Sequence, residues 1–338
     1  MSDIPQRILY INVSRIGDTL LATPAIKAVA HRFPQAQIDV LAHPKRYEVL
    51  EHLPYVHRVG GISKRSAFWK GRFGGQPYDL AFVCNFDAPL VEYALRVAKK
   101  VIAFRQADES LNRRLYQVVE PVATRSEHAV NIQLRLPAAF DIKPAGMALS
   151  YQVTPEEATW AEDFLRQSAS GAHPLIGLQV ASFPTKAYRD WPIQNFSELC
   201  TRILKQYPGA HFLIFGGSLE KDKTQALAKN LGAAATLCAG KLSLRQTAAL
   251  MARLDLYIGV DTGPTHLMGA LHRPMVALYH GDLPSWISKP LEHPALQVVD
   301  HPLAGQSCSP EEPMAAISVD QVWGVVQLAL AGGNAAKE

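Results

Sequence analysis

The 338-residue sequence has few features of a membrane-embedded or disulfide-bonded protein. No stretch approaches the roughly 18 apolar residues that a membrane-spanning helix needs. The apolar run 8–13 is too short, and too soon followed by Arg15 and Asp18, for a signal peptide. The four cysteines are widely spaced and form no CxxC pair, so neither a zinc site nor a disulfide framework is indicated. We expect a cytoplasmic protein.

Common nucleotide-binding signatures and a strong basic charge are also missing. No G-x-G-x-x-G follows either opening strand, and no G-x-x-x-x-G-K-[ST] occurs. The main sequence evidence for a dinucleotide-dependent dehydrogenase or a P-loop NTPase is therefore missing. The net charge is +4, from 34 Lys and Arg against 30 Asp and Glu, which is too small for a dedicated nucleic-acid binder. We expect no nucleic-acid partner.

The charge is unevenly distributed along the chain. Residues 1–150 hold 20 basic and 13 acidic side chains, whereas residues 151–338 hold 14 and 17. At about 150 residues per domain the length predicts two domains. One would be basic and the other slightly acidic, which indicates that they bind different ligands. Hydrophobic residues make up 48% of the chain, enough for two globular cores.

Short apolar runs alternate with helical periodicity in both halves, which predicts an α/β fold with parallel sheets. In the first half we expect strands at 7–13, 37–42 and 79–84, and helices at 19–33 and about 44–52. A connector at 143–146 and a capped helix start at 154–157 separate the halves. In the second half we expect strands at 175–180, 211–215, 256–260 and 275–279, and helices at 196–207, 219–231, 244–253 and 263–271.

A last helix at about 319–330 has no strand after it and could pack on either domain. The domain boundaries we predict are therefore 1–150, 151–318, and a C-terminal helix and tail at 319–338.

Three polar segments follow predicted strands. Residues 259–266 join a strand to a helix, and a helix N-terminus of this kind favours an anion. Residues 14–24 repeat the arrangement in the first half, with Asp18 just after the turn glycine, where open α/β sheets bind ligands. Residues 181–192 form a polar loop whose cations, Lys186 and Arg189, suit a pyrophosphate.

Each segment also has a purely structural interpretation. Residues 259–266 could be an ordinary connection capped by Asp261. Asp18 could be an N-cap, since a helix N-terminus stabilises the carboxylate and makes it a weaker base. The 181–192 loop could be a solvated loop pinned by Trp191. The local patterns alone leave these alternatives open.

Together, four ordered motifs resemble glycosyltransferase family 9, the bacterial heptosyltransferases of lipopolysaccharide inner-core assembly. They are R-x-G-D-x-L-x-x-x-P at 15–24, a loop ending in basic-x-Trp-Pro at 192, Phe-Gly-Gly-x-x-Glu at 215–220, and V-D-T-G-P-x-H-L at 260–267. The resemblance spans about residues 7–325. It implies the GT-B architecture, in which two Rossmann-like domains face each other across a cleft. The N-terminal domain would bind the acceptor and the C-terminal domain the nucleotide sugar.

The resemblance also implies an inverting, metal-independent transferase that uses ADP-heptose and no cofactor. Asp18 matches the catalytic base that takes the proton of the acceptor hydroxyl. Arg189 stands where the family has a phosphate-binding lysine, a departure that leaves Lys186 as an alternative cation. The other donor-binding positions are Thr185 on phosphate, Glu220 on the ribose, Leu242 on adenine, Asp261 near the sugar, Thr262 and Gly263 at the diphosphate, and His266, which either donates to phosphate or only packs.

A basic segment in the first half is a candidate acceptor surface. No acidic residue lies between His52 and Tyr78. We expect this segment, and Lys64 and Arg65 in particular, to bind an anionic lipid A–Kdo or core-oligosaccharide acceptor, or to make peripheral contact with the inner membrane. The structural alternative is a solvated face with buried aromatic residues. The segment contains Arg58, Lys64, Arg65, Lys70 and Arg72, interleaved with Phe68, Trp69 and Phe73.

Three other functions compete with this prediction. A family 9 transferase could use another donor or acceptor, because the motifs define the nucleotide-sugar site better than the sugar. A nucleotide-sugar epimerase on the same fold is disfavoured by the R-x-G-D segment, since an epimerase has no acceptor hydroxyl to deprotonate. A non-catalytic nucleotide-sugar-binding protein is disfavoured because Asp18 and Asp261 are both present.

Overall fold

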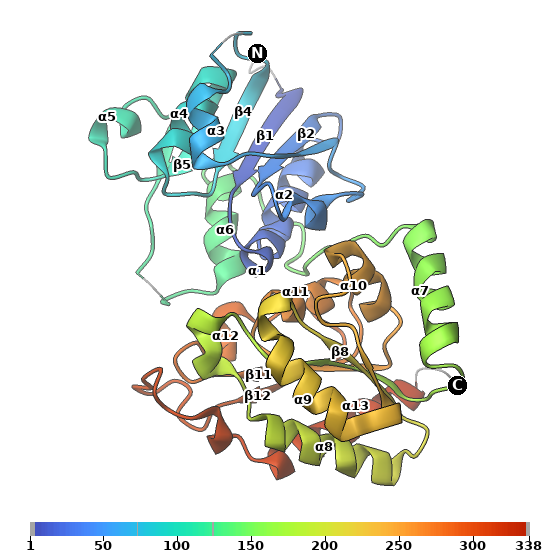
Figure 1. The fold of residues 1–338 in the computed structure, drawn as a ribbon. Coiled ribbons are helices and arrows are strands. Elements are labelled where there is room, and N and C mark those ends of the chain that lie inside the picture. Colours follow the sequence, from blue (N-terminus) through green and yellow to red (C-terminus); the bar gives the residue numbers. More distant parts are fainter. Residues whose placement is uncertain (1–3, 73, 124, 336–338) are drawn as a thin grey trace. The chain divides into compact units, whose positions relative to one another are not determined.

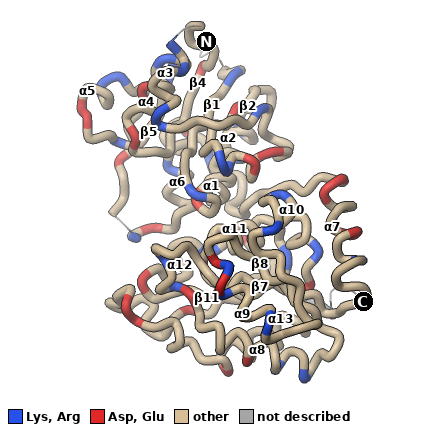
Figure 2. The backbone as a smooth tube through the Cα atoms, in the orientation of Figure 1, with Lys and Arg blue, Asp and Glu red and all other residues tan. Residues whose placement is uncertain are grey.

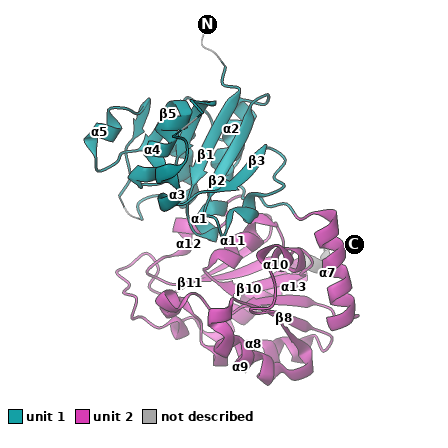
Figure 3. Ribbon diagram, turned by 45° about the horizontal axis from the view of Figure 1, so that its top comes forward, with its two compact units in different colours: residues 1–152 teal, residues 153–338 magenta. Residues whose placement is uncertain are grey.

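Each half of the chain forms a six-stranded parallel sheet with helices packed against it (Figure 1). The computed structural model describes residues 4–72, 74–123 and 125–335. It divides into two units, Met1–Gln152 and Val153–Glu338 (Figure 3). In the described residues no helix combines the length and the apolar character needed to cross a bilayer.

The first unit has the strand order β3-β2-β1-β4-β5-β6, and every pairing is parallel. Its strands are β1 (Arg7–Asn12), β2 (Gln37–Ala42), β3 (Arg58–Gly61), β4 (Tyr78–Val83), β5 (Ala98–Phe104) and β6 (Gln117–Val119). Its helices are α1 (Ile16–Leu20), α2 (Thr23–Arg32), the 3₁₀ turn η1 (Tyr47–Leu50), α3 (Lys64–Trp69), α4 (Ala88–Val97), α5 (Glu109–Asn112) and α6 (Ala129–Ala138).

The second unit has the order β12-β11-β10-β7-β8-β9, again entirely parallel. Its strands are β7 (Leu175–Gln179), β8 (His211–Phe215), β9 (Ala235–Leu237), β10 (Leu256–Val260), β11 (Met275–Tyr279) and β12 (Leu296–Asp300). Its helices are α7 (Pro155–Ser168), α8 (Ile193–Gln206), α9 (Lys221–Leu231), α10 (Leu244–Met251), α11 (Gly263–Ala270), α12 (Ser285–Ser288) and α13 (Val319–Ala335). The 3₁₀ turns are η2 (Pro184–Arg189), η3 (Ser218–Glu220), η4 (Gly232–Ala234) and η5 (Met314–Ala316).

Both sheets have the doubly wound order of Rossmann folds, so the predicted parallel α/β architecture is confirmed. In each unit the chain builds outward on one side of the first strand and then returns to its other side. The reversal lies between β1 and β4 in the first unit, and between β7 and β10 in the second. Ligands bind at the carboxyl ends of the strands at such a reversal. The polar segments beginning at Ser14, Asn85, Ala181 and Asp261 follow these four strands.

The strands that flank the reversal in the second unit are fully buried. Every residue of β7, β8, β10 and β11 is buried, as expected for parallel strands covered on both faces. These residues are contiguous apolar runs, which is why the sequence located the strands to within a residue. Helix α13 packs against α8, β11 and β12, so the last helix belongs to the second unit.

Two helix predictions in the first half were wrong. The expected helix over 19–33 is interrupted after Leu20, and a second helix begins at Thr23 with Pro24 in its first turn. Proline lacks the N–H that would continue the preceding helix, but it is tolerated in a first turn. The expected helix near 44–52 is only the turn η1. The capped start of α7 is confirmed, because Thr154 and Glu157 form a reciprocal capping box.

Helix α11, which begins at the reversal in the second unit, packs closely on Pro290. A Cβ at Gly269 would lie 2.7 Å from Cβ of Pro290 and closer still to its Cγ. The proline ring cannot rotate away as a flexible side chain would. Gly324, inside α13, has open space around the same position. The two helical glycines therefore differ in packing and not in backbone conformation.

We predict opposite effects of alanine at these two glycines. Gly324→Ala should stabilise the protein by about 0.5–1 kcal/mol, because alanine is the better helix former. Gly269→Ala should destabilise it by about 1–3 kcal/mol through overpacking, despite the same gain in propensity. Thermal unfolding should show shifts of opposite sign, about 2–4 °C per kcal/mol. An unchanged or raised melting temperature for Gly269→Ala would contradict the close packing of α11.

Candidate functional site

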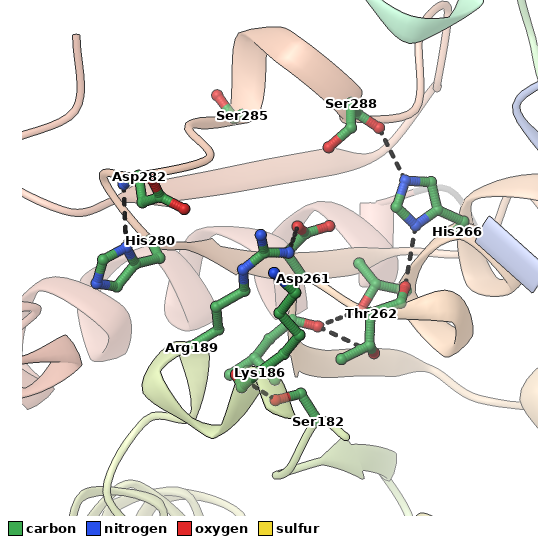
Figure 4. A network of polar contacts seen from close by, with 12 residues as sticks. Ser182, Lys186, Arg189, Asp261, Thr262, His266, His280, Asp282, Ser285 and Ser288 are labelled. Atoms are coloured by element: carbon green, nitrogen blue, oxygen red, sulfur yellow. Dashed lines mark hydrogen bonds and ion pairs between the residues drawn. The ribbon is translucent and has the colours of Figure 1, made fainter. Parts of the chain in front are cut away.

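A buried ion pair joins the two loops at the reversal of the second unit (Figure 4). Arg189, at the end of η2, places Nη1 3.4 Å from Oδ2 of Asp261, which directly follows β10. The Arg189 and Asp261 side chains are 14% and 5% exposed. An ion pair is strengthened when solvent is excluded in this way. A guanidinium is thereby held at the carboxyl ends of β7 and β10.

Further contacts orient this guanidinium. Nε of Arg189 donates to the hydroxyl of Tyr188 at 3.2 Å, and that hydroxyl donates to Oδ2 of Asp282 at 3.1 Å. Lys186 lies on the same turn, with its ammonium 5.6 Å from the centre of the Tyr188 ring. Both cations predicted to bind phosphate therefore flank one tyrosine. Tyr188 and Asp282 were not identified from the sequence, because only the fold brings the loops after β7 and β11 together.

The loop that carries both cations is closed at its base by Asp190. The Asp190 carboxylate accepts the backbone N–H of Ser182 at 2.7 Å and lies 2.6 Å from the Ser182 hydroxyl. Its second oxygen accepts from the ammonium of Lys223, on α9, at 2.6 Å. The Asp190 side chain is only 6% exposed. An acidic residue next to Arg189 was the available sequence signal, and it was missed.

The first turn of α11 has no side-chain cap. Thr262 is the N-cap residue, but its hydroxyl donates backward to the Val260 carbonyl at 3.3 Å. The Thr265 hydroxyl donates to the same carbonyl at 2.6 Å. The N-cap residue of α11 is Thr262, so the interpretation of Asp261 as the N-cap residue was wrong. Thr262 and Gly263 present the positive end of the α11 dipole at the reversal.

His266 is held between two backbone carbonyls. Its Nδ1 lies 2.9 Å from the Thr262 oxygen and its Nε2 lies 3.0 Å from the Ser288 oxygen. The residue is 5% exposed, and both ring nitrogens face acceptors on the protein. The sequence left two roles open for His266, donation to phosphate or packing alone, and this geometry favours packing. His266 connects the start of α11 to the end of α12.

The remaining predicted donor-site residues lie on neighbouring turns. Glu220, at the end of η3, accepts the Gly217 N–H at 2.5 Å, and burial raises the pKa of its carboxyl, with the nearby Asp190 adding to the rise. Leu242 is half-buried in the turn after β9, which approaches η3 through the 2.9 Å hydrogen bond from Gly240 N–H to the Gly216 carbonyl. Thr185 is exposed on η2.

Asp18 lies at the reversal of the first unit, in the first turn of α1. Its side chain is exposed, and no described residue hydrogen-bonds to its carboxylate. The N-cap of α1 is Arg15, so the interpretation of Asp18 as an N-cap was wrong. The preceding strand end is clamped by Asn85, which accepts the Val13 N–H at 2.8 Å and donates to the Val13 carbonyl at 3.1 Å.

The basic segment of the first unit is exposed together with its aromatic residues. Phe68 and Trp69 are 47% and 68% exposed and meet edge to face at 5.0 Å, with Arg72 over both rings. The structural alternative, a solvated face with buried aromatic residues, is therefore wrong for Phe68 and Trp69, and Phe73 lies outside the described residues. Lys64 pairs with Asp87 at 2.5 Å, whereas Arg65 is exposed without a described ion-pair partner.

No group of three or more His, Cys, Asp or Glu side chains within residues 4–72, 74–123 and 125–335 is arranged to hold a metal ion. The charged groups of the second-unit site are instead the cations on η2 and the carboxylates around them.

Comparisons with known proteins identify the family of this chain. The model of Glycosyltransferase family 9 (heptosyltransferase) matches residues 73–312. Lipooligosaccharide heptosyltransferase 2 of Haemophilus ducreyi is 25% identical over 307 residues, covering 83% of this chain and 85% of that protein. A family 9 glycosyltransferase from Veillonella parvula superimposes with a TM-score of 0.83 at 18% identity, covering 97% of both chains.

The structure of ADP-heptose LPS heptosyltransferase II from E. coli superimposes with a TM-score of 0.80 at 21% identity, covering 97% of this chain and 99% of that one. The predicted GT-B fold, with two Rossmann-like domains, is confirmed by these superpositions. A cleft between the domains stays a prediction. Because the family model spans well over half of the sequence, the chain belongs to glycosyltransferase family 9 and is a glycosyltransferase.

Proposed function

We propose that this enzyme transfers a heptose from ADP-heptose to a lipopolysaccharide inner-core acceptor, with inversion and without a metal ion. The observation that carries the proposal is the buried Arg189–Asp261 ion pair, with Lys186 on the same loop as Arg189. These groups lie at the carboxyl ends of β7 and β10. This arrangement suits a diphosphate next to a sugar. The printed names of the relatives, which are heptosyltransferases, support heptose as the group transferred.

The second unit would bind ADP-heptose through groups on four segments. Arg189, Lys186 and Thr185 would hold the diphosphate from one side, and the backbone of Thr262 and Gly263 from the other. Asp261 would face the heptose. Glu220 would accept from the ribose hydroxyls, and Leu242 would pack on adenine. His266 would act mainly by fixing α11 against α12, because both of its ring nitrogens already face carbonyl oxygens.

The proposed reaction is a single displacement at the anomeric carbon. Asp18 accepts the proton of the acceptor hydroxyl while that oxygen forms the new bond to the anomeric carbon. The bond from this carbon to the β-phosphate oxygen breaks, and its electron pair leaves with ADP. Negative charge therefore develops on the diphosphate, where Arg189, Lys186 and the α11 N-terminus stabilise it. The Asp18 carboxylate is exposed, and a base held close to the reacting hydroxyl is an effective proton acceptor.

The first unit would bind the acceptor, an anionic lipid A–Kdo or core oligosaccharide, with Arg65 and Lys64 contributing charge. The protein would work in the cytoplasm, in peripheral contact with the cytoplasmic face of the inner membrane. The exposed Phe68 and Trp69 beside Arg72 support this contact, because aromatic rings and basic side chains favour an anionic interface. Figure 2 shows Lys and Arg residues in blue at α3, which lies in the basic segment.

We predict that Asp18→Asn lowers kcat for heptosyl transfer by about 10²–10⁴-fold, the range expected for a lost general base. The substitution keeps the shape of the side chain, so ADP affinity and melting temperature should be unchanged. Asp141→Asn, at another exposed aspartate of the first unit, is the matched control and should keep wild-type turnover. Transfer from ADP-heptose to a Kdo-bearing lipid A acceptor is the assay, and near-normal turnover by Asp18→Asn would refute the assignment.

We predict that Arg189 is the main diphosphate cation. Arg189→Met should lower kcat/KM for ADP-heptose by about 10²–10³-fold, as loss of one placed transition-state donor does. Lys186→Met should cost about tenfold or less, since its ammonium lies over Tyr188 and not in the buried pair. Arg189→Lys should recover most of the activity, since it restores the residue of the family pattern. A larger loss at Lys186 would reverse the assignment.

We predict that reversing Lys64 and Arg65 to Glu raises the acceptor KM and leaves ADP binding intact. Each exposed cation contributes about 1 kcal/mol near an anionic surface, so Arg65→Glu alone should raise the KM roughly fivefold or more. The double variant should have a larger effect, because a new carboxylate at position 64 would also repel Asp87. Arg32→Glu, at an exposed arginine at the end of α2, is the control. Unchanged acceptor kinetics would contradict the proposed surface.

A further inference from the structure

Phe86 is an exposed aromatic ring at the reversal of the first unit. It follows β4 by three residues, and β4 lies beside β1, whose end leads to Asp18. The side chain is 60% exposed. Single exposed apolar residues are common on protein surfaces and need no explanation by themselves. The position and surroundings of this ring are what distinguish it.

The ring is supported on one face and open on the other. Phe86 stacks on the buried Phe104, with ring centres 5.3 Å apart and an interplanar angle of 26°. The other exposed aromatic rings of the first unit each lie under a cation, Arg72 over Phe68 and Trp69 and Lys100 over Tyr116. Among the described residues no cation lies over the Phe86 ring, whose second face is open to a ligand.

The backbone on both sides of the ring is fixed. Asn85 is clamped to Val13 by two hydrogen bonds, and its carbonyl accepts from Gln106 Nε2 at 3.3 Å. Asp87 pairs with Lys64 at 2.5 Å. A ring held in this way loses little conformational entropy when a ligand binds to it. The same ion pair places the ammonium of Lys64, a proposed acceptor-binding cation, at Asp87, the residue that follows Phe86 in the chain.

We propose that Phe86 is the stacking platform for a pyranose ring of the acceptor, with an anionic substituent of that sugar directed toward Lys64. The negatively polarised face of an aromatic ring attracts the polarised C–H groups on one face of a pyranose. The location fits an acceptor, because the ring and Asp18 follow the two strands of the same reversal. The inference rests on the proposed function, since it takes the first unit to bind the acceptor sugar.

Three substitutions of Phe86 separate the effect of the aromatic face from the effect of side-chain volume. Phe86→Leu keeps an apolar side chain but removes the aromatic face, and Phe86→Ala removes both. Phe86→Tyr keeps the face. The acceptor KM should rise about three- to tenfold in the first two variants, with kcat and the KM for ADP-heptose within about twofold of wild type. Phe86→Tyr should stay within about twofold of wild type on all three constants.

Tyr116→Leu is the matched control, because Tyr116 is 52% exposed in the same unit but lies under Lys100 and away from the reversal. It should leave the acceptor KM unchanged. Melting temperatures should stay close to wild type for Phe86→Leu, since the ring is exposed. An acceptor KM for Phe86→Leu equal to wild type would overturn the platform, even if heptosyl transfer itself is confirmed.

A binding measurement separates the platform from the transferase reaction. Saturation-transfer NMR with the methyl glycoside of Kdo, an anionic pyranoside, and with neutral methyl glucoside needs no turnover. The wild type and Phe86→Tyr should saturate the C–H protons of one pyranoside face, and Phe86→Leu should not. If the wild type transfers no heptose but this contact depends on Phe86, the proposed function fails and the platform stands. Saturation that is equal in wild type and Phe86→Leu overturns the platform.

Discussion

The reversal of strand order in each parallel sheet is the constraint on which both sites depend. Parallel neighbouring strands need crossover connections. In each sheet the chain first builds on one side of the first strand, β1 or β7, and then crosses to its other side. Loops that leave neighbouring strands at the reversal diverge, so their side chains reach ligands at the carboxyl edge. The same topology therefore makes two different sites. The first unit presents the exposed Asp18 and Phe86, whereas the second encloses a buried ion pair.

The charge arrangement in the second unit is compatible with an arginine where the resemblance implies a lysine. Guanidinium carries five N–H donors in a rigid plane, so under the proposed function Arg189 would keep its contacts with Asp261 and Tyr188 and still donate to phosphate. The two neighbouring carboxylates have separate roles. Asp190 fixes the loop to Ser182 and Lys223, and Asp261 orients the guanidinium. A placed cation of this kind needs little reorganisation when charge develops on the leaving group.

The sequence predicted best the elements that are buried on both faces. The strands β8, β10 and β11 were located without error, because each is a contiguous apolar run between turn residues. The strands β3, β6, β9 and β12 were missed. They lie at or near sheet edges, where partial exposure removes the apolar run, and β3 ends in two glycines. β5 was missed because Lys99 and Lys100 are exposed at its start.

The motifs likewise predicted candidate residues that follow the strands at each reversal but not how these residues pair. Adjacent positions on one loop gave no indication that Arg189 contacts Asp261 or that Asp190 contacts Lys223, since these partners are 72 and 33 residues apart. The exposure of Phe68 and Trp69 was also unpredictable, because aromatic residues interleaved with basic ones fit a buried face as well as an exposed one. Contacts between distant segments decide these questions.

Several cations of the first unit are paired locally, although residues 1–150 hold seven more basic than acidic side chains. Lys99 pairs with Asp79 at 2.9 Å, Arg105 with Glu120 at 2.7 Å, and Arg135 with Glu127 at 2.9 Å. Exposed pairs of this kind add little to the stability of the fold, but each pair cancels part of the field that a distant anion would feel. Salt screens what remains beyond about 10 Å. The proposed recognition of an anionic acceptor would therefore depend on close contacts with a few placed groups, such as Lys64 and the exposed face of Phe86.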